Sequence, residues 1–355
     1  MPKIIKGENS MSPSEKKEFK EAVNWLRNWY EERSHMSDSN GQPLISEQEK
    51  AAAFQKLEKA EVYFGLDTAG DIEQRLADGH YALTQEGLGK LDAKEGKESF
   101  FKSIMSFIRG RDELSLRGAS SHTSLEPAII YLDDRQNRKP VDMFMNDRSE
   151  LVRAEPVMHW SLGGVTAHES THTMGLSGQE KKTEAFYKDF ADKDTSRYNA
   201  YLDDGKEIYA RVNQYRFTHD IDPSHVFTKE EISALREKHL NQIMEYLGKF
   251  EEANDKAVKT GSAVLPDMPK GDMMLFFRYN DEQLLHFFND TASLEKGKTL
   301  DLLHREGRAD TVNDRNFACV SDENRRIIRD CQMKWERQET GLDLASGQKS
   351  CHRMA

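Results

Sequence analysis

Two stretches near the start of the chain repeat apolar residues with the period of an α-helix. The first follows the segment SPSE at 12–15, where serine and glutamate three residues apart can cap a helix reciprocally and proline suits its first position. Behind it the apolar residues recur three or four positions apart: Phe19, Val23, Leu26 and Tyr30. Ser46 and Glu49 repeat the capping signal before a second helix, and Gly65 is a suitable C-terminal stop. The pattern predicts two amphipathic helices.

Between residues 127 and 146 the pattern changes to that of β-strands. PAIIYL at 127–132 is a short apolar run, and PVDMFMN at 140–146 alternates Val141, Met143 and Met145 with its other residues. The polar segment DDRQNRK between the two runs predicts a turn. We therefore expect a hairpin, with 128–132 and 141–145 in one sheet.

The remainder of the chain is helical in pattern. Thr228 and Glu231 cap another predicted helix, and the segment around Pro266–Gly271 is the best candidate for a linker. The fold class we expect is α+β and predominantly helical, with a small mixed sheet. We divide the chain into three sections: an N-terminal helical section at 1–115, a core at 116–265 and a C-terminal helical section at 266–355.

Composition narrows the class of protein. The chain has 355 residues, of which 37% are hydrophobic and 32% charged, which is typical of a soluble globular protein. Its formal net charge of −11 argues against a nucleic-acid partner. No apolar run has the length of a membrane span or of a secretory signal peptide, and the three cysteines are too few and unevenly spaced for a disulfide framework. We expect a cytoplasmic protein, or one exported by a route without a cleavable signal peptide.

The segment GGVTAHESTHTMGLSGQE at 163–180 contains the strongest chemical signal. Two histidines four residues apart lie on one face of a helix, so His168 and His172 can direct their imidazoles at one zinc ion. Glu169 sits about 100° round the helix from His168. That position suits a general base that activates a metal-bound water. The alternative is a pair of surface histidines on a polar helix face.

These residues resemble the HExxH motif of the zincin superfamily of zinc metallopeptidases. The resemblance implies one zinc ion and a zincin-like core at 116–265, in which a mixed sheet precedes the active-site helix. Zincins hold the substrate along an edge strand of that sheet, and 140–146 is the segment that we expect to do so here. The longer metzincin motif places its third histidine at a position that is Gly178 in this chain, so a metzincin assignment fails.

The third zinc ligand is less certain than the two histidines. Gluzincins, a branch of the zincins, take it from a glutamate on a later helix, which here favours Glu207 over Glu184. Glu207 lies one residue before the apolar face of a predicted helix, in a segment that resembles some phage and effector-type metallopeptidases. Alternatively, Glu207 completes a capping box, and Glu184 is a solvated charge. Other candidates for the ligand are His159, His219 and Asp189.

Further residues have possible supporting roles. Arg211, one helical turn beyond Glu207, can orient that carboxylate. An oxyanion-stabilising group can come from His219, His225, Tyr201 or Tyr209, and the sequence does not choose among them. For the two histidines, a polar turn is the simpler interpretation.

The resemblance implies a zinc-dependent endopeptidase that hydrolyses a protein or peptide substrate, with Glu169 as general base. Two rival hypotheses remain. One is a non-enzymatic structural or virion-associated protein with a zincin-like fold. The other is a secreted effector or toxin protease.

Overall fold

The structure is a computed structural model of the whole chain, and it is mostly helical with a small mixed sheet. It describes these residues: 1–37, 41, 43, 45–65, 68–85, 87–88, 100–102, 104–105, 119–132, 142–145, 151–153, 161–175, 205–260, 262–264, 275–276, 281, 284–285 and 287–289. The α+β class expected from the sequence is confirmed at this level.

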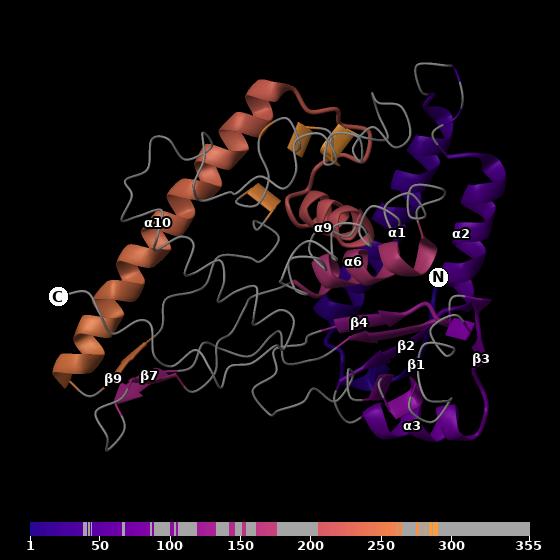
Figure 1. Cartoon of the computed structure of the whole chain (residues 1–355), viewed down its shortest axis with the longest axis horizontal. Coiled ribbons are helices and arrows are strands. Elements are labelled where there is room, and N and C mark those ends of the chain that lie inside the picture. Colours follow the sequence, from indigo (N-terminus) through magenta and orange to yellow (C-terminus); the bar gives the residue numbers. More distant parts are fainter. Residues whose placement is uncertain are drawn as a thin grey trace.

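A four-stranded mixed sheet lies at the centre of the fold (Figure 1). Its strands, in spatial order, are β1 (Lys3–Lys6), β2 (Glu61–Phe64), β6 (Ile129–Leu132) and β4 (Ala119–His122). β1, β2 and β6 are parallel to one another, whereas β4 runs antiparallel to β6 along one edge. β2 and β6 are buried over their whole length, because helices cover both faces of the sheet.

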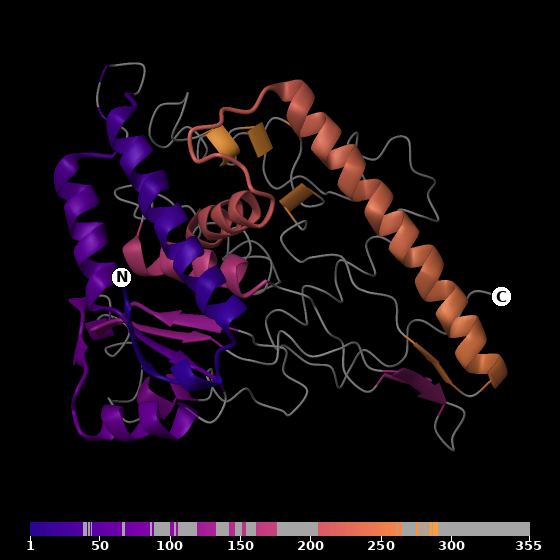
Figure 2. The ribbon, with the colours of Figure 1, turned by 180° about the vertical axis from the view of Figure 1, so that it is seen from behind.

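Three helices share an apolar core with one face of this sheet: α1 (Pro13–His35), α2 (Glu47–Lys59) and α6 (Leu162–Met174). A fourth, α9 (Gly205–Thr218), packs along α6 (Figure 1). The opposite face packs against α3 (Ala69–Ala77), as the view from behind also shows (Figure 2). Successive side chains of a strand point to opposite faces of the sheet. Val62 and Phe64 therefore pack in the core with α1, α2 and α6, and Tyr63 packs in the core with α3.

The first two helices begin where the sequence predicts. Ser12 and Glu15 form a reciprocal capping box at the start of α1, and Ser46 and Glu49 form another at the start of α2. The apolar residues predicted to share one face of α1 are all buried: Phe19, Val23, Leu26 and Tyr30. Local signals therefore determine where both helices begin.

The predicted hairpin is wrong, although both of its segments are strands. β6 pairs with β2 and β4, while β7 (Asp142–Met145) pairs with β8 (Leu151–Arg153) and β9 (Ser262–Val264) in a separate antiparallel sheet. That sheet packs on α10 (Lys229–Thr260), near the helix end remote from α9 (Figures 1 and 2). The physical reason is that both edges of β6 are already paired, so β7 has no place beside it.

Several shorter elements complete the described part of the chain: the 3-10 helix η1 (Glu8–Ser10) and the paired strands β3 (Ala82–Leu83) and β5 (Leu125–Glu126). The central sheet combines strands from the predicted N-terminal section with strands from the predicted core. The division into three sections itself stays a prediction, and the linker at 266–271 lies outside the described residues. Among the described helices, none has the length and apolar character needed to cross a membrane.

Candidate metal centre

Helix α6, which contains the HExxH residues, is held at both ends by local interactions. The hydroxyl of Ser161 accepts a hydrogen bond of 2.9 Å from the N–H of Gly164 and caps the first turn. At the other end Gly175 has a φ of 73°, a conformation that glycine adopts without strain, and its N–H donates to the carbonyl of Thr171. The predicted end of the helix at Gly175 is confirmed.

Nearly the whole of α6 is buried, which its small residues permit. Every residue from Leu162 to Met174 except His172 is buried. A Cβ atom at Gly163 would lie 2.4 Å from the ring of Phe217 on α9, closer than real contacts allow. The backbone of α6 therefore packs directly against a side chain of α9, and the alternative of two histidines on a solvated helix face is wrong.

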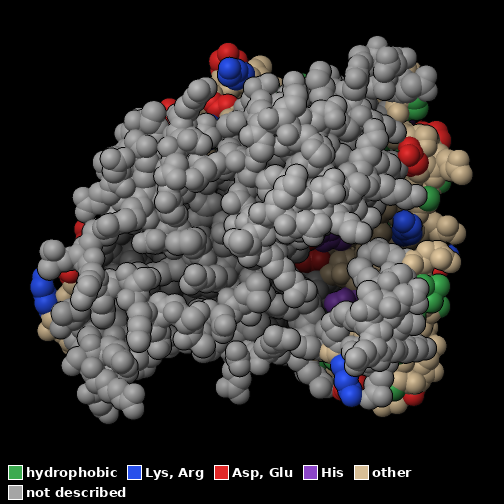
Figure 3. Space-filling view, viewed as in Figure 1, with side chains coloured by type: hydrophobic (Ala, Val, Ile, Leu, Met, Phe, Trp, Pro, Cys, Tyr) green, Lys and Arg blue, Asp and Glu red, His purple; other side chains and the backbone are tan. Residues whose placement is uncertain are grey.

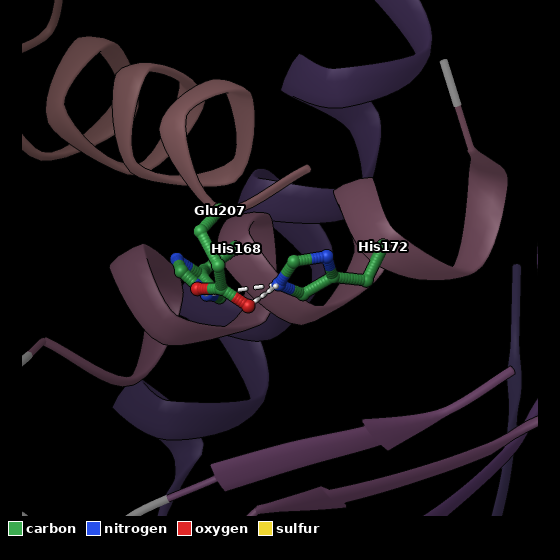
Figure 4. Close-up of side chains that lie close together, drawn as sticks. All are labelled: His168, His172 and Glu207. Carbon is green, nitrogen blue, oxygen red and sulfur yellow. Dashed lines mark hydrogen bonds and ion pairs between the residues drawn. The ribbon is translucent and has the colours of Figure 1, made fainter. Parts of the chain in front are cut away.

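Three side chains from α6 and α9 converge on one point (Figure 4). The Nε2 atoms of His168 and His172 are 3.1 Å apart. Oε1 of Glu207, in the first turn of α9, lies 3.2 Å from Nε2 of His172, and its Oε2 lies 3.5 Å from Nε2 of His168. One donor atom from each residue lies within 4.8 Å of the other two. The structure thus brings the two histidines together with the glutamate favoured from the sequence.

The charges of this cluster suit a cation. Burial lowers the pKa of His168 to about 4, so its imidazole is neutral at pH 7 and can offer a lone pair. Burial opposes ionisation of Glu207, but the neighbouring imidazoles of His172 and His168 outweigh it and hold the pKa of this carboxyl well below its usual range. Two imidazole nitrogens and one carboxylate form a donor set typical of zinc.

The residues present fit a metal ion by a further criterion. Oε2 of Glu207 is buried and has no hydrogen-bond partner among the described residues. An unsatisfied buried carboxylate oxygen costs free energy that a bound cation removes. Within the described part of the chain the cluster has three ligands, which leaves a tetrahedral ion one further position.

Glu169 lies beside the cluster without taking part in it. Its side chain is buried, and none of the described residues hydrogen-bonds its carboxyl group. Burial, together with the negative charge of Glu207, raises the pKa of Glu169 to about 7. Glu169 directly follows His168 on α6 and is not among the three residues whose donor atoms converge, so its role as a base stays a prediction.

The antiparallel edge strand β4 lies against α6 close to Glu169. The hydroxyls of Ser121 on β4 and Thr173 on α6 are 3.0 Å apart, and the hydroxyl of Thr173 also donates to the backbone carbonyl of Glu169. On the face shown in Figure 3, histidine and acidic side chains are visible at the floor of a hollow. The antiparallel edge strand beside α6 is thus β4, and β7 lies in the separate sheet, so the expectation that 140–146 forms the edge strand next to this helix is wrong.

Helix α9 contributes polar side chains beside Glu207 near its contact with α6, among them Arg211, Asn213 and Gln214. Nη2 of Arg211 is 3.8 Å from Oε2 of Glu207, in agreement with the orienting role expected for it. Oε1 of Gln214 is 3.1 Å from Nδ1 of His168. The sequence analysis missed Gln214. Its signal was available, since a residue seven positions after Glu207 lies on the same helix face two turns on.

The other candidate residues are not brought to the cluster or lie outside the described residues. His219 packs against the rings of Tyr215 and His239, with centroid distances of 4.2 and 5.7 Å. His225 pairs with Glu231, at 3.4 Å. Tyr209 packs in the core between the helices and the sheet. The following candidates lie outside the described residues: His159, Glu184, Asp189 and Tyr201.

Comparison with known proteins identifies no relative. No family model matches the sequence, and no curated protein or solved structure is significantly similar to it. Any functional conclusion therefore depends on the chemistry of the site itself.

Proposed function

We propose that this chain is a zinc-dependent endopeptidase. The observation that carries the proposal is the convergence of His168, His172 and Glu207 on one point, with the buried carboxyl of Glu169 next to His168 in sequence and not hydrogen-bonded by any described residue. Three protein ligands and one open position are typical of catalytic zinc, whereas structural zinc sites have four protein ligands.

The arrangement around the cluster also favours a zincin-like core. A mixed sheet with an antiparallel edge strand lies beside the helix that contains HExxH, as in the superfamily that this motif resembles. A gluzincin-like ligand set follows if Glu207, from the later helix α9, is the third ligand. These are parts of the same proposal.

Each protein side chain has a defined task in this mechanism. His168, His172 and Glu207 would hold the zinc ion, which would supply a Lewis acid that acidifies a water molecule and polarises the scissile carbonyl. Glu169 accepts the proton of the attacking water and transfers it to the departing amine nitrogen. The guanidinium of Arg211 partly neutralises the negative charge of Glu207. Burial of His168 and Glu207 keeps bulk water from competing with these residues for the metal.

Strand β4 is the most suitable place for the substrate backbone. Among the described strands it pairs with β6 alone, so its other edge can accept an extended peptide as an added strand. The hydrogen bond between Ser121 and Thr173 fixes that edge relative to α6. A peptide on β4 would therefore lie beside Glu169.

The test is to separate zinc binding from hydrolysis. We expect the purified protein to bind about one zinc ion, and Glu169→Gln to retain zinc while losing cleavage of a peptide library. His168→Ala should lose both. Glu245→Gln, at an exposed position of α10, is the control and should change neither. Equal zinc content in wild type, His168→Ala and His172→Ala would refute the site. Full zinc with a fourth protein ligand, seen by X-ray absorption, and no cleavage would favour a structural role instead.

A further inference from the structure

The imidazole of His168 is held from both sides. Its Nε2 faces His172 and Glu207, while its Nδ1 lies 3.1 Å from Oε1 of Gln214. A carbonyl oxygen only accepts hydrogen bonds, so this contact requires the hydrogen of the neutral ring to be on Nδ1. The lone pair is then on Nε2, where the metal is proposed to bind.

We propose that Gln214 is a positioning residue that holds His168 in the Nδ1–H tautomer and so directs its Nε2 at the metal. The inference rests on the proposed zinc site. It extends that proposal by naming a residue that touches neither the ion nor the substrate. Ligating histidines commonly donate their second N–H to an acceptor, and loss of the acceptor costs about 10–100-fold in metal affinity.

The packing of α9 makes this contact well defined. Gln214 is 3% exposed, so little water competes for the N–H of His168. The approach of the two helices depends on Gly164, because a Cβ there would lie 2.6 Å from Oγ1 of Thr218 and 3.6 Å from Cγ of Gln214. Gly164 therefore allows α9 to approach α6 closely at Thr218, one turn beyond Gln214.

The opposite orientation of the amide makes the proposal testable. If the amide NH2 of Gln214 faced the ring, it would donate to Nδ1, and the hydrogen of His168 would be on Nε2. That tautomer has no lone pair toward Glu207 and must change before a metal binds. The tautomer of His168 in the metal-free protein thus distinguishes the two orientations without any measurement of catalysis.

Three variants isolate the acceptor. Gln214→Met keeps the length and apolar contacts of the side chain but removes the acceptor, whereas Gln214→Glu keeps an acceptor at the same place. Gln242→Met is the matched control, because Oε1 of Gln242 accepts from Nδ1 of His239 at 2.8 Å, away from the cluster. Each protein is compared by zinc affinity in competition with a chelator, by the ring nitrogen shifts of 15N-labelled histidine without metal, and by urea unfolding.

We expect Gln214→Met to lower zinc affinity about 10–100-fold, Gln214→Glu to restore it to within a few-fold of wild type, and Gln242→Met to leave it unchanged. The metal-free wild type should show His168 with its hydrogen on Nδ1, and Gln214→Met should lose that preference. An Nε2–H tautomer in the wild type overturns the proposal. So does an equal loss of zinc affinity in Gln214→Met and Gln214→Glu when both unfold at the wild-type urea concentration. A wild type that binds no zinc refutes the proposed function, and the tautomer measurement then decides the role of Gln214 by itself.

Discussion

The hydroxyl of Ser121 on the edge strand β4 lies 3.0 Å from the hydroxyl of Thr173 on α6. Thr173 in turn donates to the backbone carbonyl of Glu169, so the edge of the sheet and the proposed base are connected through two side chains. In the proposed mechanism this connection relates the position of a peptide on β4 to the position of Glu169.

Removal of that connection should impair cleavage without loss of metal. We expect Ser121→Ala to lower kcat/KM about tenfold, equivalent to about 1.4 kcal/mol, while zinc content is unchanged. The free energy of unfolding should fall by about 1 kcal/mol, the value of one ordinary hydrogen bond. Thr260→Ala, which removes a hydroxyl bonded within the end of α10, is the control for cleavage. Wild-type kcat/KM in Ser121→Ala would exclude a role for β4 in holding substrate.

The third ligand can be identified by exchange of carboxylate for amide. Glu207→Gln should weaken zinc binding by more than about a hundredfold. Loss of a residue that hydrogen-bonds a ligand already costs about 10–100-fold in metal affinity, and loss of the ligand itself costs more. Glu184→Gln, the competing carboxylate from the sequence, should bind zinc like the wild type. Isothermal titration of the metal-free proteins measures both. The opposite result, with Glu184→Gln weakened and Glu207→Gln unaffected, would reassign the ligand.

The close contact between α6 and α9 can be tested by alanine substitution of two glycines, one at the contact and one away from it. In Gly163→Ala the new methyl group would lie 2.4 Å from the ring of Phe217, so we expect a loss of about 1–3 kcal/mol in the free energy of unfolding and weaker zinc binding as α9 shifts. Gly70→Ala on α3 is the matched control, since no atom lies within 4 Å of its new Cβ. The free energy of unfolding of that variant should rise by up to about 1 kcal/mol, and its zinc affinity should equal that of the wild type. If Gly163→Ala and Gly70→Ala changed zinc affinity equally, the packing of α6 on α9 would have no influence on zinc binding.

A second polar cluster, at the start of β2, should make stability depend on pH. Burial raises the pKa of Glu61, but hydrogen bonds from Tyr81 and His80 and the charge of Arg75 outweigh it, so the pKa is below its ordinary value of 4.5. A carboxyl with a lowered pKa in the folded state stabilises fully above its unfolded pKa, and this stabilisation is lost as pH falls through the folded value.

Glu61→Gln should therefore cost about 3 kcal/mol at pH 7, because it leaves Arg75 and the tyrosine hydroxyls poorly paired. Urea unfolding from pH 7 to pH 3 should show the difference from wild type shrinking below about pH 4.5, the unfolded value. A difference that stays constant over this range would mean that the ionised form of Glu61 contributes nothing.

Local signals in the sequence predicted helix boundaries and two of the three residues of the cluster. The capping boxes at Ser12 and Ser46 and the stop at Gly175 depend on neighbouring residues, so they can be identified without the tertiary fold. The spacing of His168 and His172 likewise requires only a helix. Glu207 was favoured over Glu184 because it lies one residue before the apolar face of a predicted helix. This is a weaker indication than the spacing of the two histidines.

Strand partners could not be predicted in the same way. The alternating pattern of 141–146 shows that the segment suits a strand with one buried face, but pairing partners are remote in sequence, and β7 joins β9 across more than a hundred residues. β4 was missed because ASSH has neither an apolar run nor alternation. Gln214 is not a candidate metal ligand, so the spacing of ligand residues does not mark it, and only its place on the same face of α9 as Glu207 does.

The order of the elements along the chain has a consequence for how the protein acquires metal during synthesis. Strands β1 and β2 and helix α1 are made early, and both histidines of α6 follow, but Glu207 and Gln214 emerge from the ribosome only with α9. Until then a nascent chain has two imidazoles without their carboxylate or their orienting amide. If the chain is the zinc protease proposed above, tight zinc binding requires α9 to pack on Gly163 and Gly164, so the protease becomes active only after the sheet and its covering helices have been synthesised.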